Sequence, residues 1–125
     1  MKRLLAIFLM GVSCFLFSCG NDAREHFNQG DAYHQLGKLE EAAAEYKKGI
    51  SITPNLAQAH NNLGYIYYEL GNLDEAIAEY KMAISINPAH PFAHNNLGLA
   101  YFDKGKTDEA IVEYLKKTYN LMIGE

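Results

Sequence analysis

The sequence predicts an all-α fold, a solenoid of three helix-turn-helix repeats with six helices. Three observations predict it. From Ala23 onward the same residues recur every 34 positions, apolar residues within each unit follow helical spacing, and glycine or proline stands where helices should end. The composition fits a packed domain, because 49% of the 125 residues are hydrophobic and 21% are charged.

The first eighteen residues have the pattern of a secretory signal peptide. Lys2 and Arg3 precede an apolar run from Leu4 to Phe17. As a helix, this run of about fourteen residues would span roughly 21 Å, less than the roughly 30 Å hydrocarbon core of a bilayer. Residues 1–18 are therefore predicted to be a cleaved signal peptide rather than a membrane-spanning helix.

The end of this run, Leu16-Phe17-Ser18-Cys19, resembles a bacterial lipobox, although Phe17 is bulkier than the residue usual there. The resemblance implies lipidation of the Cys19 thiol and cleavage after Ser18, with residues 19–22 as the lipidated N-terminus and a short linker. The expected location is the extracytoplasmic side of the bacterial cell envelope. Because Gly20 rather than Asp follows the cysteine, the outer membrane is favoured in a Gram-negative host. The alternatives are a secreted chain without lipid and a short uncleaved anchor.

The rest of the chain divides into three units, residues 23–56, 57–90 and 91–125. Identical residues stand at equivalent positions of all three units. These columns include His26, His60 and His94; Asn28, Asn62 and Asn96; Gly30, Gly64 and Gly98; Gly37, Gly71 and Gly105; and Tyr46, Tyr80 and Tyr114. Because one supersecondary unit of this size cannot bury its apolar face alone, the three units are expected to stack.

The middle unit shows why each element is expected. Its first helix is predicted over about Ala57–Leu70 and ends at Gly71, which tolerates a left-handed conformation. Its second helix is predicted over Asp74–Ile86, with Asn72 or Asp74 as its cap, and Pro88 prevents further extension. The two helices are expected to cross closely at the small residues Gly64 and Ala76. Their apolar stripe, at helical spacing, is Leu63, Tyr67, Ile77 and Tyr80.

This pattern resembles the tetratricopeptide repeat. The signature residues of the middle unit are Leu63-Gly64, Tyr67, Ala76, Tyr80, Ala83 and Pro88. The resemblance covers about residues 23–121 and implies a right-handed α-solenoid whose first helices line a concave groove that binds a peptide.

The third unit departs from the pattern after Tyr114. One inserted residue near Leu115 would align Thr118 with the column of Ala83, and no closing proline follows. The last helix is then expected to expose an apolar strip of Ile111, Leu115, Tyr119 and Met122. Three alternatives remain open: a partner docks there, the chain self-associates through this helix, or the reading frame is truncated.

The resemblance places an asparagine ladder in the concave groove, where amides can hold the backbone of an extended peptide. Aromatic side chains on the same face suit apolar anchors of that peptide. The predicted groove residues are Asn28, Asn61, Asn62, Asn95, Asn96, Tyr65, Tyr68, Phe92 and Phe102. A Lys and Arg clamp for a terminal carboxylate, as in chaperone-binding members of the family, is not expected, because Phe27 and Asp31 replace two of its residues.

Other functions find little support. The net charge of −4 argues against binding to nucleic acid. No catalytic motif is present, so no enzyme activity and no cofactor are expected. No metal site is expected either, because successive repeats would hold the three column histidines about 10 Å apart, so they pad adjacent helices. The predicted function is a membrane-tethered interaction scaffold or assembly factor. The alternatives are a substrate-recruiting accessory subunit of an envelope enzyme and a self-associating structural lipoprotein.

Overall fold

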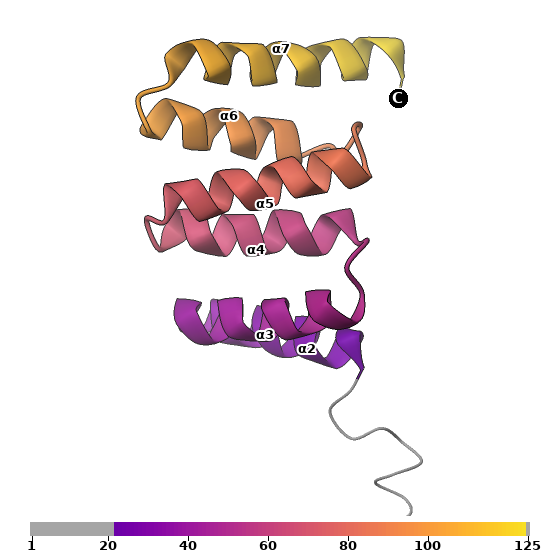
Figure 1. The fold of residues 1–125 in the computed structure, drawn as a ribbon, viewed down its shortest axis with the longest axis vertical. Coiled ribbons are helices and arrows are strands. Elements are labelled where there is room, and N and C mark those ends of the chain that lie inside the picture. Colours follow the sequence, from indigo (N-terminus) through magenta and orange to yellow (C-terminus); the bar gives the residue numbers. More distant parts are fainter. Residues whose placement is uncertain (1–21, 125) are drawn as a thin grey trace, which may run out of the picture.

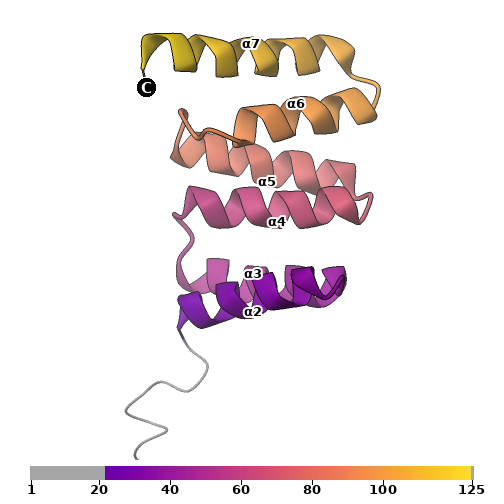
Figure 2. The ribbon, with the colours of Figure 1, turned by 180° about the vertical axis from the view of Figure 1, so that it is seen from behind.

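Six α-helices and no strand make up residues 22–124, the part of the chain that the computed structural model describes. Their bounds are α2 Ala23–Gln35, α3 Leu39–Ile52, α4 Ala57–Glu69, α5 Leu73–Ile86, α6 Ala93–Asp103 and α7 Thr107–Ile123. They stack along the long axis of the molecule, from α2 and α3 at one end to α7 at the other (Figures 1 and 2). The predicted all-α solenoid is confirmed. The predicted signal peptide and Cys19 lie outside the described residues.

The turn inside each repeat depends on one glycine with positive φ. Gly37, Gly71 and Gly105 have φ angles of 73°, 81° and 85° and follow α2, α4 and α6. A side chain at these positions would be strained in this left-handed region, so the prediction for Gly71 is confirmed. Asn72 is the N-cap of α5, one of the two positions predicted, but its side chain makes no capping hydrogen bond.

The two helices of a repeat cross where the sequence has its small residues. A Cβ atom at Gly64 would lie 2.7 Å from the ring of Tyr80 and 3.3 Å from the carbonyl oxygen of Ala76. Ala76 is fully buried and Tyr80 is 1% exposed. The ring of Tyr80 therefore occupies the space that any side chain on residue 64 would need, as predicted for this crossing.

Stacking of successive repeats forms the core. One cluster joins α5, α6 and α7, and its buried members are Ala76, Ile77, Tyr80, Leu97, Ala100, Tyr101 and Ala110. A second cluster joins α3 and α4 through Ala42, Ala43, Tyr46, Leu63 and Ile66. The second helices α3 and α5 are thus each covered by the first helix of the next repeat, which makes the repeats depend on their neighbours.

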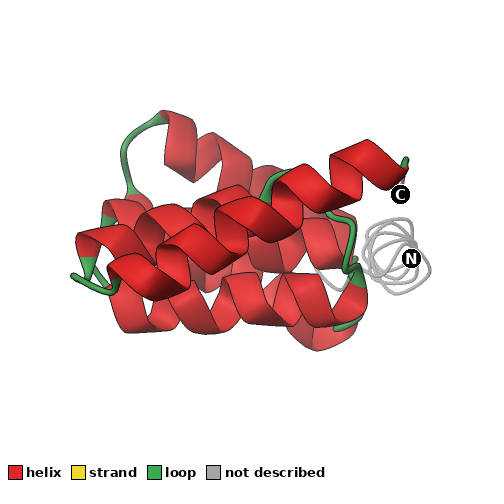
Figure 3. Cartoon of the chain, turned by 90° about the horizontal axis from the view of Figure 1, so that it is seen from above, coloured by secondary structure: helices red, strands yellow, loops and turns green. Residues whose placement is uncertain are grey.

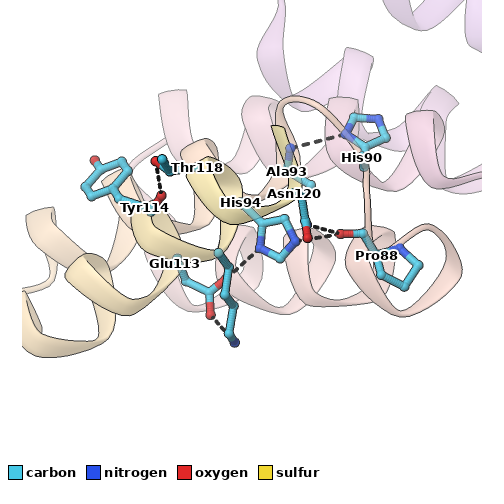
Figure 4. A network of polar contacts seen from close by, with 9 residues as sticks. Pro88, His90, Ala93, His94, Glu113, Tyr114, Thr118 and Asn120 are labelled. Carbon is cyan, nitrogen blue, oxygen red and sulfur yellow. Dashed lines mark hydrogen bonds and ion pairs between the residues drawn. The ribbon is translucent and has the colours of Figure 1, made fainter. Parts of the chain in front are cut away.

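The histidine column connects helices within a repeat, and it does so by hydrogen bonds rather than by padding alone. His94 Nδ1 lies 2.8 Å from Glu113 Oε2 on α7, while its Nε2–H donates to the Pro88 carbonyl at 2.8 Å (Figure 4). His60 repeats this arrangement with Glu79 and Pro54. Both ring nitrogens face oxygen atoms, and the hydrogen on Nε2 is used by the proline carbonyl. The contact between Nδ1 and the glutamate oxygen must therefore contain a hydrogen of its own. Among residues 22–124, no group of three or more metal-binding side chains is close enough to hold an ion.

The inserted residue expected near Leu115 is not found. α7 is continuous from Thr107 to Ile123, and Lys117 rather than Thr118 stands at the position of Gly49 and Ala83. The Lys117 ammonium donates to Asn95 Oδ1 on α6 at 3.4 Å, whereas Thr118 is exposed and donates to the Tyr114 carbonyl of its own helix. A long cationic side chain therefore replaces a small buried residue between α6 and α7.

The outward face of α7 is apolar and exposed, as predicted. Its strip comprises Ile111, Leu115, Tyr119 and Met122, which are 51%, 63%, 63% and 81% exposed. By contrast, Ile77, the α5 counterpart of Ile111, is 8% exposed because α6 covers it. Figure 3 looks down the stack from the α7 end, where no further described helix lies over α7.

None of the helices within residues 22–124 combines the length and the hydropathy needed to cross a bilayer.

Candidate functional site

The first helices of neighbouring repeats form a cavity between α2 and α4. It has a volume of about 200 Å³ and is lined by Asp31, His34, Tyr46, Asn61, Asn62, Tyr65 and Ile66. Three of the predicted groove residues, Asn61, Asn62 and Tyr65, line it. The sequence pattern alone assigns no binding role to Asp31 or His34.

A directional chain of hydrogen bonds connects the second repeat to the first, and three of its members, Asn62, Tyr46 and Asp31, line this cavity. In the linker before α6, His90 Nε2–H donates to Gln58 Oε1 at 3.0 Å. Gln58 then donates to Asn62 Oδ1 at 2.7 Å, and Asn62 donates to the Tyr46 hydroxyl at 3.0 Å. The Tyr46 hydroxyl donates to Asp31 on α2. Every donor in the chain points toward the Asp31 carboxylate, so each bond polarises the next.

Burial and the bond to Asp31 raise the pKa of the Tyr46 hydroxyl, which therefore remains a hydrogen-bond donor. Likewise, the hydrogen bond to Asp103, with some burial, raises the pKa of the Tyr68 hydroxyl to about 12. Tyr68 lies on α4 and Asp103 on α6, and His34 on α2 bonds Glu69 on α4. Carboxylates thus bind tyrosine or histidine across each junction between first helices.

The five predicted asparagines do not form one free ladder. Asn28 is exposed on α2. Asn61 is 5% exposed, and its Oδ1 accepts from Asn96 Nδ2 at 3.0 Å, so this pair bridges α4 and α6. Asn62 bonds Tyr46 and Gln58, and Asn95 accepts from Lys117. Most of these amides therefore connect helices and are not free to hold a peptide backbone.

The predicted aromatic residues are the exposed part of this face. Tyr65 is 43% exposed, Phe92 60% and Phe102 58%, whereas Tyr68 is half-buried. The Tyr65 ring packs edge-on against His34 with centroids 5.8 Å apart, and Phe92 packs edge-on against His90 at 6.2 Å. These rings are held by neighbours yet keep apolar surface in solvent, which suits the anchors of a bound segment.

A second and larger hollow lies on the other side of the stack, between α5 and α7. Its volume is about 530 Å³, and its lining is mostly apolar: Ile84, Pro88, His94, Val112, Leu115, Lys116, Tyr119 and Asn120. The sequence indicated it only through the apolar strip of α7, because Ile84 and Pro88 are contributed by the preceding repeat.

His90 is a structural residue that the repeat pattern does not reveal. Its Nδ1 accepts from the backbone amides of Phe92 and Ala93 at 3.3 and 3.2 Å, which requires a neutral ring at the start of α6. Burial, with His94 adding repulsion, lowers the pKa of His90 below its ordinary 6.5. The unfolded chain therefore binds a proton more readily than the folded chain. The stability that His90 contributes is complete above pH 6.5 and is lost as the pH falls toward its folded pKa.

His90→Leu, which introduces the residue found at the equivalent Leu56, is expected to remove this titration. Wild-type melting temperature should fall more steeply than that of the variant between about pH 7 and about pH 5.5. Thermal unfolding followed by circular dichroism measures both. If the melting temperatures of wild type and variant changed in parallel with pH, the neutral ring of His90 would contribute nothing to the pH dependence of stability.

Comparison with protein families identifies the class. Residues 30–71 and 64–105 match the TPR repeat family, and together they exceed half of the chain. The chain therefore belongs to the TPR, or tetratricopeptide repeat, family. A comparison with curated proteins found no match.

Solved structures with the same fold include a crystal structure of MamA. It superposes with a TM-score of 0.81 at 29% identity over 83% of this chain, and this chain spans 61% of the length of that one. The first TPR of Spaghetti (RPAP3), bound to the HSP90 peptide SRMEEVD, has a TM-score of 0.76 at 25% identity, with 79% of each chain covered.

Proposed function

We propose that the chain is an interaction scaffold or assembly factor that binds a peptide segment of another protein along its first helices. The observation that carries this proposal is a set of three exposed rings on the first helices: Tyr65 on α4, which lines the α2–α4 cavity, and Phe92 and Phe102 at the two ends of α6. A related TPR unit bound to the peptide SRMEEVD supports a peptide as the ligand. TPR repeats generally act as interaction modules, so the proposal includes no catalytic step.

The experiment compares two exposed apolar side chains on different faces. The full chain, as wild type, Phe102→Ala or Leu115→Ala, is used to capture partners from a bacterial envelope extract. Removal of an aromatic anchor is expected to weaken capture about tenfold or more, whereas Leu115→Ala retains it. Loss of capture with Leu115→Ala alone would show that the partner binds at α7. Unchanged capture with both variants would refute the groove as the binding site.

The lipid anchor is the second part of the proposal. A lipidated Cys19 would hold the first repeat close to the membrane, because α2 begins at Ala23. Two or more acyl chains bind a bilayer stably, whereas a single chain binds only marginally. We propose an extracytoplasmic location in the bacterial envelope, with the partner recruited to that surface.

Self-association through α7 is the second candidate function, favoured by the strip of exposed apolar residues on that helix. The opposite end of the stack is more polar: Gln29 of α2 replaces the buried Leu63 and Leu97 of α4 and α6. A head-to-tail contact would bury Gln29 against apolar side chains, so a two-fold α7–α7 contact is the expected arrangement. Sedimentation velocity of wild type and Leu115→Ala at several concentrations tests it, and a concentration-independent monomer in both would exclude it.

A further inference from the structure

The first helices of the repeats carry an excess of negative charge. Within α2, α4 and α6 there are four carboxylates but only one cation, Arg24, and no lysine. The carboxylates are Glu25, Asp31, Glu69 and Asp103. Asp31 lines the cavity, and Glu69 and Asp103 bond the groove residues His34 and Tyr68.

The α2–α4 cavity combines three kinds of group that favour a cation. Asp31 is exposed and uses Oδ1 to accept from Tyr46. The ring of Tyr65 stands on another wall, where an aromatic face attracts an ammonium or guanidinium group. Asn61 and Asn62 also line the cavity, and their carboxamide oxygens, which already accept from Asn96 and Gln58, add partial negative charge. The volume of about 200 Å³ is several times that of a water molecule, so the cavity can admit a long side chain.

We propose that the groove selects a basic peptide, in which a lysine or arginine side chain enters the α2–α4 cavity against Asp31 and a neighbouring apolar residue packs on the exposed rings. This inference rests on the proposed function and names its partner class. An acidic segment such as SRMEEVD, the ligand of the related Spaghetti unit, would meet repulsion from Asp31, Glu69 and Asp103. The stem of a basic side chain would cover apolar surface while its charged end reaches the carboxylate.

The test is an array of immobilised heptapeptides probed with the full chain in detergent. Each peptide contains one aromatic residue and, at varied spacing from it, a lysine, a glutamine or a glutamate. Lysine peptides are expected to bind best and glutamate peptides least. Asp31→Asn should weaken the lysine peptides about three- to tenfold, the range for a lost charge-assisted contact at a partly exposed site, and leave the glutamine peptides unchanged.

Asp31→Asn is suited to this test because asparagine keeps an oxygen that accepts from Tyr46, so the fold is preserved; thermal melting verifies it. Glu75→Gln is the matched control, since it removes an exposed carboxylate from α5, outside the groove. Equal binding of glutamate and lysine peptides, or a lysine preference that Asp31→Asn leaves intact, would overturn the basic-peptide inference while leaving the groove function. Binding of all peptides that is insensitive to Phe102→Ala, or no binding at all, would refute the groove function itself.

Discussion

Leu97→Ala is expected to destabilise the whole chain, lowering the free energy of unfolding by about 2–5 kcal/mol. Leu97 is 2% exposed and lies in the cluster that joins α5, α6 and α7. Alanine would leave a cavity between the second and third repeats. Because single domains are stable by only about 5–15 kcal/mol, this loss is a large fraction of the total.

Urea unfolding followed by circular dichroism measures the effect. Leu115→Ala is the matched control, because the same atoms are removed from a side chain that is 63% exposed. Its free energy of unfolding should change by no more than about 0.5 kcal/mol. If the two variants had the same unfolding midpoint, the stacking of α6 on α5 would be wrong.

Cys19→Ser is expected to abolish membrane attachment altogether. The proposed lipid forms a thioether with the thiol, and a serine hydroxyl does not replace it as the acceptor in the lipobox that Cys19 resembles. Radiolabelled palmitate should label the wild type and not the variant, and the variant should stay unprocessed or become soluble. Cys14→Ser is the control, because Cys14 lies within the apolar run and should be dispensable. A Cys19→Ser chain found with membranes at the mature size would contradict the anchor.

The features that follow from local sequence were predicted well. The positive φ of Gly71 follows from its place after a helical segment, and the contact of Gly64 with Tyr80 follows from small and large residues that recur every 34 positions. Both features are the same in every repeat. Periodicity therefore reveals them without knowledge of any distant contact.

The features that were missed depend on partners on another helix or on residues that do not recur in every repeat. Asn62 looks like a free groove residue in sequence, but Tyr46 of the preceding repeat is its acceptor. His90 has no counterpart in the first repeat, where Leu56 stands, and its partner Gln58 is 32 residues away. In α7 the predicted insertion places Thr118 in the small-residue column, whereas the continuous helix places Lys117 there.

These corrections change which side chains should test the groove. Asn62 and Asn96 connect helices, so replacing them would alter the fold together with any binding. A control lysine outside the groove should make no contact with an aromatic ring, which rules out Lys81 on α5, whose ammonium lies 5.7 Å from the centre of the Tyr101 ring. Tyr65 and Phe102 are exposed and separate binding from folding more clearly, and exposed Lys47 on α3 is a better control.

Site-specific photocrosslinking in living cells tests the central claim most directly. A photoreactive phenylalanine analogue replaces Tyr65 in the groove, Lys47 on α3 or Tyr119 on α7. The account predicts that the Tyr65 position forms a covalent adduct with another protein and that the Lys47 position forms none. The absence of an adduct at the Tyr65 position, whether or not the Tyr119 position forms one, would contradict a peptide-binding groove on the first helices.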